Sequence, residues 1–438
     1  MCNTTRLLHL VLVIICAATL VGTQGGTVYP AHAAPAAATR YVKPSATGTG
    51  DCSSWANACT LQTALGVATS GDEIWVGAGT HKPTAGSDRS ATFQLKNGVG
   101  VYGGFAMTET LRSQRNWTAN VTVLSGDIGA AGNNSDNSYH VVTGSGTDGT
   151  TILDGFTVTG GNANGSPEPD NLGGGMYNSY GNPTVQNVVF SNNSTTNSGG
   201  GMHNSHSSPT LVNVTFSGNT AVNGGDGGGM VNTDSSVPLL INVTFSGNSV
   251  TGSNSEGGGM LNIDCRPILL NVTFANNSTT GGNGGAMYND GVNGPVLTNV
   301  TFYSNTAIMD SGQNGGYGGA IYNYATSNYT MTNVTFSGNR AVGLDAGHPA
   351  YGGAMYTIAG SVTARNAIFW GNTPDQAYND SSTVTINTSV VQGGCPTGST
   401  CTGIITADPL LGAPGNYGGY VQTIPLLPGS SAIDAAND

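Results

Sequence analysis

Short runs of alternating apolar and polar residues, separated by glycine-rich corners, recur through most of the chain. The stretch GGGMHNSHSSPTLVNVTFSGN at 199–219 contains both repeated elements, a Gly-Gly-Gly/Ala-Met/Ile corner and a Phe-x-x-Asn corner. The first element supplies one apolar residue per repeat, namely Met176, Met202, Met230, Met260, Met287, Ile321 and Met355. The second element supplies Phe190, Phe216, Phe245, Phe274, Phe302, Phe336 and Phe369. The two series interleave without exception, so one structural unit is repeated.

The period of the repeat averages about 30 residues. The interval from each Met or Ile to the next Phe is 14 or 15 residues, whereas the interval onward to the following Met or Ile varies from 12 to 19. Short alternating strands without an amphipathic helix cannot bury their apolar residues alone, but stacked parallel coils can. We therefore predict an all-β fold, a right-handed parallel β-helix. The coil is too long for the hexapeptide form, and the GGxGxD nonapeptide of calcium-binding rolls does not occur.

Two columns of asparagine are expected to stack from coil to coil through side-chain hydrogen bonds. The column after the Met corner comprises Asn178, Asn204, Asn232, Asn262, Asn289 and Asn323. The column after the Phe corner comprises Asn193, Asn219, Asn248, Asn277, Asn305, Asn339 and Asn372. The recurring NVTF also forms an N-x-Thr glycan acceptor, but its repetition at one coil position favours a ladder.

Residues 34–150, before the regular repeats, are interpreted as a cap and irregular first coils of the same β-helix. The stretch TLQTALGVA at 60–68 places its leucines and alanines on one helical face, which suits a helix that covers the open first coil. Strands are expected at EIWVG, ATFQL, VGVYGGF, VTVLSG and YHVVTG. We expect regular coils over 151–393 and a separate segment over 394–438.

Residues 1–33 have the features of a secretory signal peptide. They contain Arg6, the apolar run LLHLVLVIICAATLV at 7–21 and a small-x-small site at Ala31-His32-Ala33. A retained membrane anchor is the alternative interpretation. No later stretch is apolar enough to span a bilayer, so we expect export and no transmembrane segment after cleavage.

The remaining cysteines agree with an oxidising compartment. They are Cys52, Cys59, Cys265, Cys395 and Cys401. The spacing predicts two local disulfides, Cys52 with Cys59 and Cys395 with Cys401, and leaves Cys265 as a buried or free thiol. It does not fit a zinc site, and we expect neither metal nor cofactor.

Composition narrows the possible partners and reactions. The 69 glycines and the 8% of charged residues differ from those of an ordinary globular enzyme, and 11 Lys and Arg against 23 Asp and Glu give a net charge of -12. Nucleic acid is excluded as a partner because phosphate binding needs clustered cations. A lyase acting on uronates also needs cations, yet residues 151–392 contain only Arg266, Arg340 and Arg365 as strong bases, on different coils.

Several motifs resemble known families of secreted β-helix proteins. The paired GGGM, GGAM or GGAI and FSGN or FANN tetrapeptides resemble the repeats of polymorphic outer-membrane proteins, which implies a right-handed β-helix at a bacterial surface. CTLQTAL, GDEIWVGAGTHKPT and VYGGF are similar to the start of pectate-lyase-like surface proteins. The tail ADPLLGAPGNYGGYVQTIPLLPGSSAIDAAND resembles a choice-of-anchor Q segment. Members of that family usually continue past the PGSSAID motif, so at Asp438 we expect either a fragment or a chain that lacks the sorting portion.

One column of polar residues is a candidate catalytic site. Four residues after the inward Met, successive coils present Tyr180, His206, Asp234 and Asp264. Because neighbouring coils lie about 4.8 Å apart, Asp234 and Asp264 are candidates for the carboxylate pair of a retaining glycosidase, with His206 beside them. The alternative is a solvated turn, where Asp and His are common.

Two further columns are expected to face outward. One contains Tyr177, His203, Val231, Leu261, Tyr288, Tyr322 and Tyr356, and its aromatic members are candidates for stacking on sugar rings or docking a protein. The alternative is that the variable arcs cover these side chains. The other contains Thr215, Thr244, Thr273, Thr301 and Thr335, a hydroxyl ladder that suggests ice binding, although the β-propensity of threonine also explains it.

The leading hypothesis is a secreted or cell-surface β-helix protein, at a bacterial surface or outer membrane, with a structural or adhesive role. It would bind a surface glycan or another protein through the outward faces of its coils, with no catalytic residue. The alternative is a carbohydrate-active enzyme or polysaccharide-binding module, and ice binding is a minor alternative.

Overall fold

The computed structural model describes residues 37–436 except 292, 313–314 and 325–327. Residues Ala37–Asp438 form one compact unit. The predicted signal peptide at 1–33 lies outside the described residues. No helix in the described part of the chain is long and apolar enough to cross a membrane.

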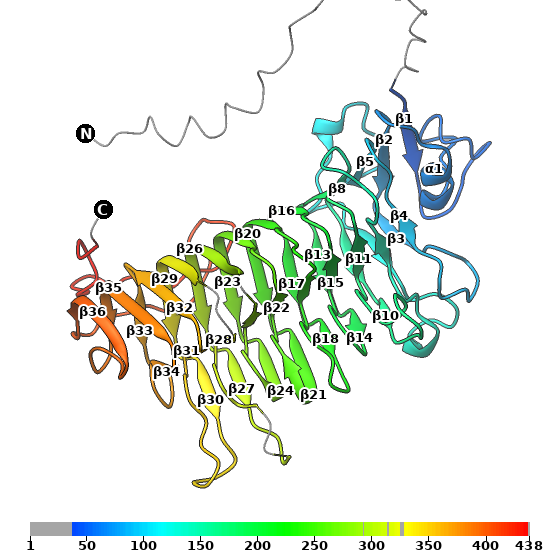
Figure 1. Cartoon of the computed structure of the whole chain (residues 1–438). Coiled ribbons are helices and arrows are strands. Elements are labelled where there is room, and N and C mark those ends of the chain that lie inside the picture. Colours follow the sequence, from blue (N-terminus) through cyan, green and yellow to red (C-terminus); the bar gives the residue numbers. More distant parts are fainter. Residues whose placement is uncertain (1–36, 292, 313–314, 325–327, 437–438) are drawn as a thin grey trace, which may run out of the picture. The chain divides into compact units, whose positions relative to one another are not determined.

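The described residues form three sheets whose strands pair in parallel from coil to coil (Figure 1). The 10-stranded sheet contains β4 (Phe93–Gln94), β7 (Val142–Thr143), β11 (Met176–Ser179), β15 (Met202–Ser205), β19 (Met230–Thr233), β22 (Met260–Ile263), β25 (Met287–Asp290), β28 (Ile321–Tyr324), β31 (Met355–Ile358) and β34 (Ala377–Asp380). The 7-stranded sheet contains β10 (Asn162–Ala163), β14 (Ser194–Thr195), β18 (Thr220–Ala221), β21 (Ser249–Glu256), β24 (Ser278–Asn283), β27 (Thr306–Ile308) and β30 (Arg340–Val342).

The 19-stranded sheet receives two short strands, or one long strand, from each coil. Its first members are β1 (Thr39–Val42), β2 (Glu73–Gly77), β3 (Gly79–His81), β5 (Gly100–Phe105), β6 (Thr122–Ser125), β8 (Ile152–Asp154), β9 (Thr157–Thr159), β12 (Thr184–Gln186), β13 (Val189–Ser191), β16 (Thr210–Val212) and β17 (Thr215–Ser217). The later members are β20 (Leu239–Ser246), β23 (Ile268–Ala275), β26 (Asn293–Tyr303), β29 (Asn328–Ser337), β32 (Ser361–Arg365), β33 (Ile368–Trp370), β35 (Thr383–Val391) and β36 (Ser399–Ile405). The fold is the predicted right-handed parallel β-helix.

The repeated Met and Phe positions build the core. The Met or Ile at the start of each 10-stranded-sheet strand from β11 to β31 is fully buried, and Met176 pairs in register with Met202. The seven phenylalanines from Phe190 to Phe369 are also fully buried, and the rings of successive coils stack with centroids 4.7–5.0 Å apart. This spacing matches the distance between adjacent β-strands, so one aromatic column runs through the regular coils.

The N-terminal end carries the predicted cap helix, α1 (Leu61–Val67). The hydroxyl of Thr60 accepts a hydrogen bond from the Thr63 amide at its N-terminus, and Leu61, Ala64 and Leu65 are buried. The expected strands at EIWVG, ATFQL, VGVYGGF, VTVLSG and YHVVTG all occur, as β2, β4, β5, β6 and β7. Two 3₁₀ turns, η1 (Arg112–Gln114) and η2 (Asn134–Asp136), lie among these irregular coils.

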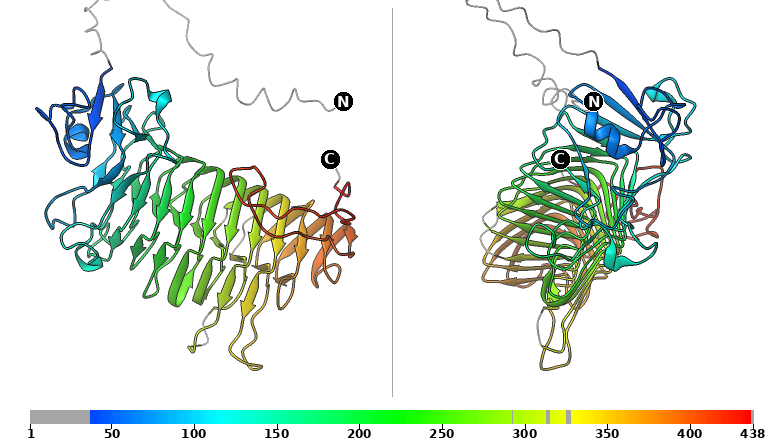
Figure 2. Two further views of the ribbon diagram at one scale, coloured as in Figure 1. Left: turned by 180° about the vertical axis from the view of Figure 1, so that it is seen from behind. Right: turned by 90° about the vertical axis from the view of Figure 1, so that its right-hand side faces the viewer.

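The C-terminal segment turns back over the outer face of the 19-stranded sheet (Figure 2, red). β36 pairs with β35 and adds one further strand to the sheet. Between β36 and residue 436, the chain forms only isolated bridges, Leu411 with Leu426 and Gly415 with Thr423. The backbone oxygen of Gln422 accepts a hydrogen bond from the Thr273 hydroxyl at 2.6 Å, so this segment lies across the middle coils.

Candidate functional site

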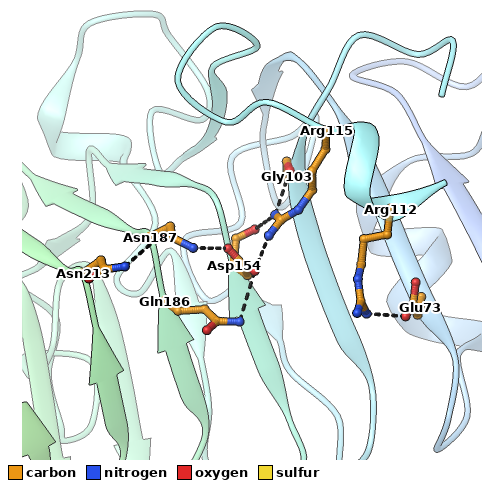
Figure 3. A network of polar contacts seen from close by, with 8 residues as sticks. All are labelled: Glu73, Gly103, Arg112, Arg115, Asp154, Gln186, Asn187 and Asn213. Atoms are coloured by element: carbon orange, nitrogen blue, oxygen red, sulfur yellow. Dashed lines mark hydrogen bonds and ion pairs between the residues drawn. The ribbon is translucent and has the colours of Figure 1, made fainter. Parts of the chain in front are cut away.

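A groove lies on the outer face of the 19-stranded sheet. Figure 3 shows a network of polar contacts that includes two of its lining residues, Asn187 and Asn213. The Arg115 guanidinium forms an ion pair with Asp154 at the end of β8, and it also donates to the backbone oxygen of Gly103 at 3.1 Å. The side chains of Arg115 and Asp154 are only 9% and 4% exposed. Beside them, Arg112 pairs with Glu73. Both arginines are thus neutralised by carboxylates within the protein.

The floor of this groove is the first part of a third asparagine ladder, whose members Asn187, Asn213 and Asn242 line the groove. Except for the last member, which precedes Ala367, the ladder residues are the asparagines of the recurring NV motif. These residues sit where each coil bends between two strand segments, and they have left-handed backbone conformations with φ of 52° to 57°. They are Asn187, Asn213, Asn242, Asn271, Asn299, Asn333 and Asn366. Asparagine tolerates this conformation better than most residues, which explains its repetition here. From Asn213 onward, each amide nitrogen donates to the asparagine oxygen of the preceding coil at 3.0–3.3 Å.

The N-terminal end of this ladder is a carboxylate. Asn187 donates from Nδ2 to Asp154 Oδ1 at 2.9 Å, and Gln186 donates to Asp154 Oδ2 at 3.1 Å. One N–H and one oxygen lone pair of each ladder amide remain outside the ladder bonds, because a primary amide carries two donors and two acceptor sites. The floor therefore presents regularly spaced donors and acceptors along the coils.

Two exposed aromatic rings line the same hollow as this floor. Trp117, which follows η1, is 41% exposed and lies beside Gly155, whereas Tyr420 of the C-terminal segment is 74% exposed. Both rings line one hollow of 570 Å³ together with Asn187, Asn213 and Asn242. We call this feature the ladder groove. No charged side chain lines it among the described residues.

The sequence-predicted catalytic residues lie elsewhere, on the outer face of the 10-stranded sheet. His206, Asp234 and Asp264 line a second hollow of 670 Å³, together with Glu168, Tyr177 and His203. We call it the acidic hollow. The three predicted residues have left-handed φ values of 50° to 57° and follow the ends of strands β15, β19 and β22. The structure thus places them in one hollow, on three successive coils.

Hydrogen bonds define the state of Asp234 in the acidic hollow. Its Oδ2 accepts from the Ser205 hydroxyl at 2.7 Å and from the Thr233 hydroxyl at 2.9 Å. The Ser205 bond is the main reason that the pKa of Asp234 is lowered, and the residue is a carboxylate at neutral pH. His206 Nδ1 lies 3.8 Å from Asp234 Oδ2, and its ring stacks on Tyr180 with centroids 4.5 Å apart.

A general acid for glycoside cleavage requires a carboxyl group with a raised pKa. Among the residues that the structure describes, burial raises the pKa of four carboxyl groups, those of Asp226, Glu256, Asp290 and Asp375. None of the four lines the acidic hollow. The catalytic role of Asp234 and Asp264 stays a prediction.

The expectation of an exposed aromatic stripe is wrong for most of its column. His203, Tyr288, Tyr322 and Tyr356 are at most 9% exposed, and Tyr177 is partly buried. The covering side chains include Tyr317 and Tyr351, which come from the long variable arcs before the glycine corners. The rings of Tyr288, Tyr322 and Tyr356 stack on one another with centroids 5.1 and 5.2 Å apart. Because the arcs cover them, these tyrosines stabilise the coils and offer no open face to a sugar.

The threonine column is also not a flat exposed ladder. Thr273 is fully buried, and its hydroxyl is bonded to the C-terminal segment at Gln422. Tyr303 donates from its hydroxyl to Gln422 Oε1 at 2.7 Å on the next coil. The segment therefore interrupts the regular hydroxyl array that ice binding would need.

The residues predicted to be structural lie in the interior or at the ends of the fold. The ladder from Asn178 through Asn204, Asn232, Asn262 and Asn289 to Asn323 has Nδ2–Oδ1 distances of 2.8–3.0 Å. The ladder from Asn193 to Asn372 has distances of 2.9–3.0 Å. Disulfides join Cys52 to Cys59 and Cys395 to Cys401, and Cys265 is a buried free thiol.

Sequence reasoning missed a pair of half-buried carboxyl groups, Asp226 and Glu256, which precede strands β19 and β22 on neighbouring coils. Asp226 Oδ1 accepts a hydrogen bond from the Glu256 amide at 2.9 Å. Burial raises the pKa of Asp226 to about 6, and burial together with the facing Asp226 raises the pKa of Glu256 to about 8. Each of these residues lies four positions before the inward-facing Met of its coil. This regular spacing is visible in the sequence and could have identified the pair. In the described residues, no three His, Cys, Asp or Glu side chains come together as a metal site.

Comparison with known proteins gives a repeat match and several distant structural likenesses. Residues 299–324 match the model of the Chlamydia polymorphic membrane protein repeat. The structure of pectate lyase Pel9A is similar at 18% identity and a TM-score of 0.47, over 80% of this chain and 78% of that one. The catalytic unit of GH87 α-1,3-glucanase from Streptomyces thermodiastaticus strain HF3-3 is similar at 15% identity and a TM-score of 0.44, over 85% and 70%. A search of curated sequences finds no match.

The fold defines the class of this chain as a right-handed parallel β-helix protein. The repeat match covers 26 of its 438 residues and connects that stretch to the polymorphic membrane protein repeat.

Proposed function

We propose that the protein is a secreted β-helix protein of the bacterial surface or outer membrane that adheres to a neutral polysaccharide through the ladder groove. The observation that carries this proposal is the pair of exposed rings, Trp117 and Tyr420, that line one hollow together with a row of asparagine amides. Aromatic rings provide apolar faces against which sugar rings pack, and amides exchange hydrogen bonds with hydroxyl groups.

The length of the groove suits a chain rather than a single sugar. Three coil steps separate Gly155, beside Trp117, from Asn242, which corresponds to about 14 Å at the usual spacing of parallel strands. The donors and acceptors of Asn187, Asn213 and Asn242 repeat over this length. A polysaccharide with a repeating sugar unit would find the same hydrogen-bond donors and acceptors at each coil.

The charges favour a neutral glycan over a uronate polymer. Arg112 and Arg115 are each paired with a carboxylate, so each already has a charge partner within the protein. The lining of the groove carries no charge, and the chain as a whole has a net charge of -12. The polymorphic membrane protein repeat at 299–324 supports the surface location in this proposal.

A pull-down on insoluble neutral polysaccharides, with release of reducing ends scored in the same samples, tests the proposal. We expect the wild-type protein to be retained without cleavage, and Trp117→Ala and Tyr420→Ala each to weaken binding by about tenfold, as for loss of one stacking ring. Tyr417→Ala is the matched control, because this ring is 59% exposed in the same segment but does not line the groove. Retention that survives both groove substitutions, or cleavage abolished by Asp234→Asn, would overturn the proposal.

A further inference from the structure

The third asparagine ladder continues beyond the ladder groove toward the C-terminal coils. Asn271, Asn299 and Asn333 do not line the groove, yet all three residues are exposed. The Nδ2–Oδ1 distances stay between 3.0 and 3.3 Å as far as Asn366, so the amides remain in one line from coil to coil. At the usual spacing of parallel strands, the line from Asn187 to Asn366 is about 29 Å long.

The C-terminal segment crosses several coils (Figure 2, red) and lies beside this line of amides. Tyr420 lines the ladder groove, whereas Leu426 lines a smaller hollow of 150 Å³ together with Asn333 and Asn366. Between these two points, Gln422 accepts hydrogen bonds from β23 and β26, which belong to the intervening coils. The segment therefore follows the ladder coil by coil and forms one wall along the exposed amides.

The ladder leaves the same hydrogen-bonding groups free once per coil. Each amide from Asn213 to Asn333 uses one N–H and one oxygen lone pair within the ladder, and a primary amide has two of each. A bound chain can satisfy successive amides only if its own repeat is close to the coil spacing of about 4.8 Å. The ladder therefore selects a ligand by the distance that each of its units advances.

The linkage of a neutral glycan decides whether it meets this condition. In a β-1,4-linked chain of glucose or N-acetylglucosamine both linkage bonds are equatorial, so the chain is straight and each sugar advances by nearly one coil step. In an α-1,4-linked chain one linkage bond is axial, so the chain curls and leaves a straight line of amides after a few sugars. The equatorial arrangement also exposes the apolar ring faces that pack against aromatic side chains.

We propose that the third asparagine ladder, from Asn187 to Asn366, is a linear binding track for a straight, neutral, β-1,4-linked glycan. This inference rests on the function proposed above and adds the linkage and the length of the ligand. Trp117 and Tyr420 pack against sugars in the ladder groove, and the chain continues over the exposed amides beside the C-terminal segment. Because each coil offers a further amide, the affinity grows with the number of sugars.

Calorimetric titration of the full chain with oligosaccharides of defined length tests the track. The probes are β-1,4-linked oligomers of glucose and of N-acetylglucosamine, from the dimer to the hexamer. In at least one of these series we expect the affinity to rise about fivefold with each added sugar, as for one net hydrogen bond per coil. The α-1,4-linked glucose oligomers of the same lengths are the matched control, and their affinity should stop rising at the trimer.

Asn271→Gly tests the part of the track beyond the ladder groove. It removes one exposed amide and keeps the left-handed backbone at φ 55° accessible. We expect the ratio of hexamer to trimer affinity to fall about fivefold. Asn254→Gly is the control and should leave this ratio unchanged, because Asn254 is also exposed at φ 63° but belongs to β21 of the 7-stranded sheet.

Four results would overturn the track. They are absence of binding by both β-linked series, equal affinities for the β-linked trimer and hexamer, equal affinities for α- and β-linked hexamers, and a ratio that Asn271→Gly leaves unchanged. None of them decides the function proposed above, because the pull-down with Trp117→Ala and Tyr420→Ala measures retention on polysaccharides whatever their linkage.

Discussion

Asn187 donates a hydrogen bond from Nδ2 to Asp154 Oδ1 over 2.9 Å. This contact gives the asparagine ladder on the outer face, from Asn187 to Asn366, its direction, and we call this ladder the exterior ladder. A carboxylate only accepts hydrogen bonds, so Asn187 must turn its nitrogen toward Asp154 and its oxygen toward Asn213. Each later amide repeats that orientation and donates to the preceding coil. The interior ladders run the opposite way, since Asn204 donates to Asn232 of the following coil.

Removing this anchor should destabilise the N-terminal coils. Asp154→Ala leaves the Arg115 guanidinium, only 9% exposed, without its charge partner and leaves Asn187 without its acceptor. We expect a loss of about 3 kcal/mol in the free energy of unfolding, which is typical of breaking a buried ion pair from one side. Urea-induced unfolding measures it, with Asp434→Asn as an exposed control. An equal change in the two variants would contradict the anchoring role.

An asparagine of an interior ladder should contribute more to the free energy of unfolding than an asparagine of the exterior ladder. Asn248 is fully buried, its Oδ1 accepts from both the amide and the side chain of Asn219, and its Nδ2 donates to Phe216 O and Asn277 Oδ1. Asn248→Ala leaves these groups unpaired, so we expect a loss of about 3 kcal/mol in the free energy of unfolding.

The matched substitution on the exterior ladder is Asn299→Gly, which removes one more exposed rung and keeps the left-handed backbone at φ 56° accessible. Here we expect a loss below about 1 kcal/mol. Thermal unfolding of both variants provides the comparison. If the two lose the same stability, burial does not set the strength of the ladders.

The carboxyl pair of Asp226 and Glu256 should make stability fall as pH rises. Their pKa values in the folded protein, about 6 and about 8, lie above the ordinary values. Between the ordinary and the raised pKa the folded state holds more protons than the unfolded state, so unfolding becomes more favourable with increasing pH.

Glu256→Gln should remove most of this pH dependence between about pH 5 and 8 and stabilise the protein at the upper end by on the order of 2 kcal/mol. Asn283 already places an amide at the equivalent position of the next coil. Unfolding free energies measured across this pH range for both proteins test the prediction. A pH dependence that persists unchanged in the variant would assign it to other groups.

The repeated part of the fold was predictable because its spacing is strict. The fixed interval between Met176 and Phe190, repeated in each coil, places both residues in one core, and the register of Met176 with Met202 follows from it. Stacking also accounts for the ladders, since an asparagine at a fixed position lies beside the same residue of its neighbour. The cap helix was predictable from the sequence because the leucines and alanines of 60–68 lie on one helical face.

The ladder groove was not predictable because its defining residues come from irregular segments. Trp117 follows a 3₁₀ turn, and Tyr420 lies in a segment that folds back over coils more than 100 residues earlier in the chain. No periodicity relates such positions. The burial of Tyr322 and Tyr356 was also not predictable. Tyr317 and Tyr351, which pack against them, belong to arcs whose lengths vary from coil to coil.

The most direct test of adhesion through the ladder groove is a glycan array probed with the wild-type protein and a Trp117→Ala, Tyr420→Ala double variant at low and high salt. The account predicts that the wild type is retained on neutral glycans equally at about 0.1 M and about 1 M salt, because uncharged contacts are not screened. The double variant should lose this retention. Retention confined to charged glycans, or neutral binding that the double variant keeps, would contradict the account.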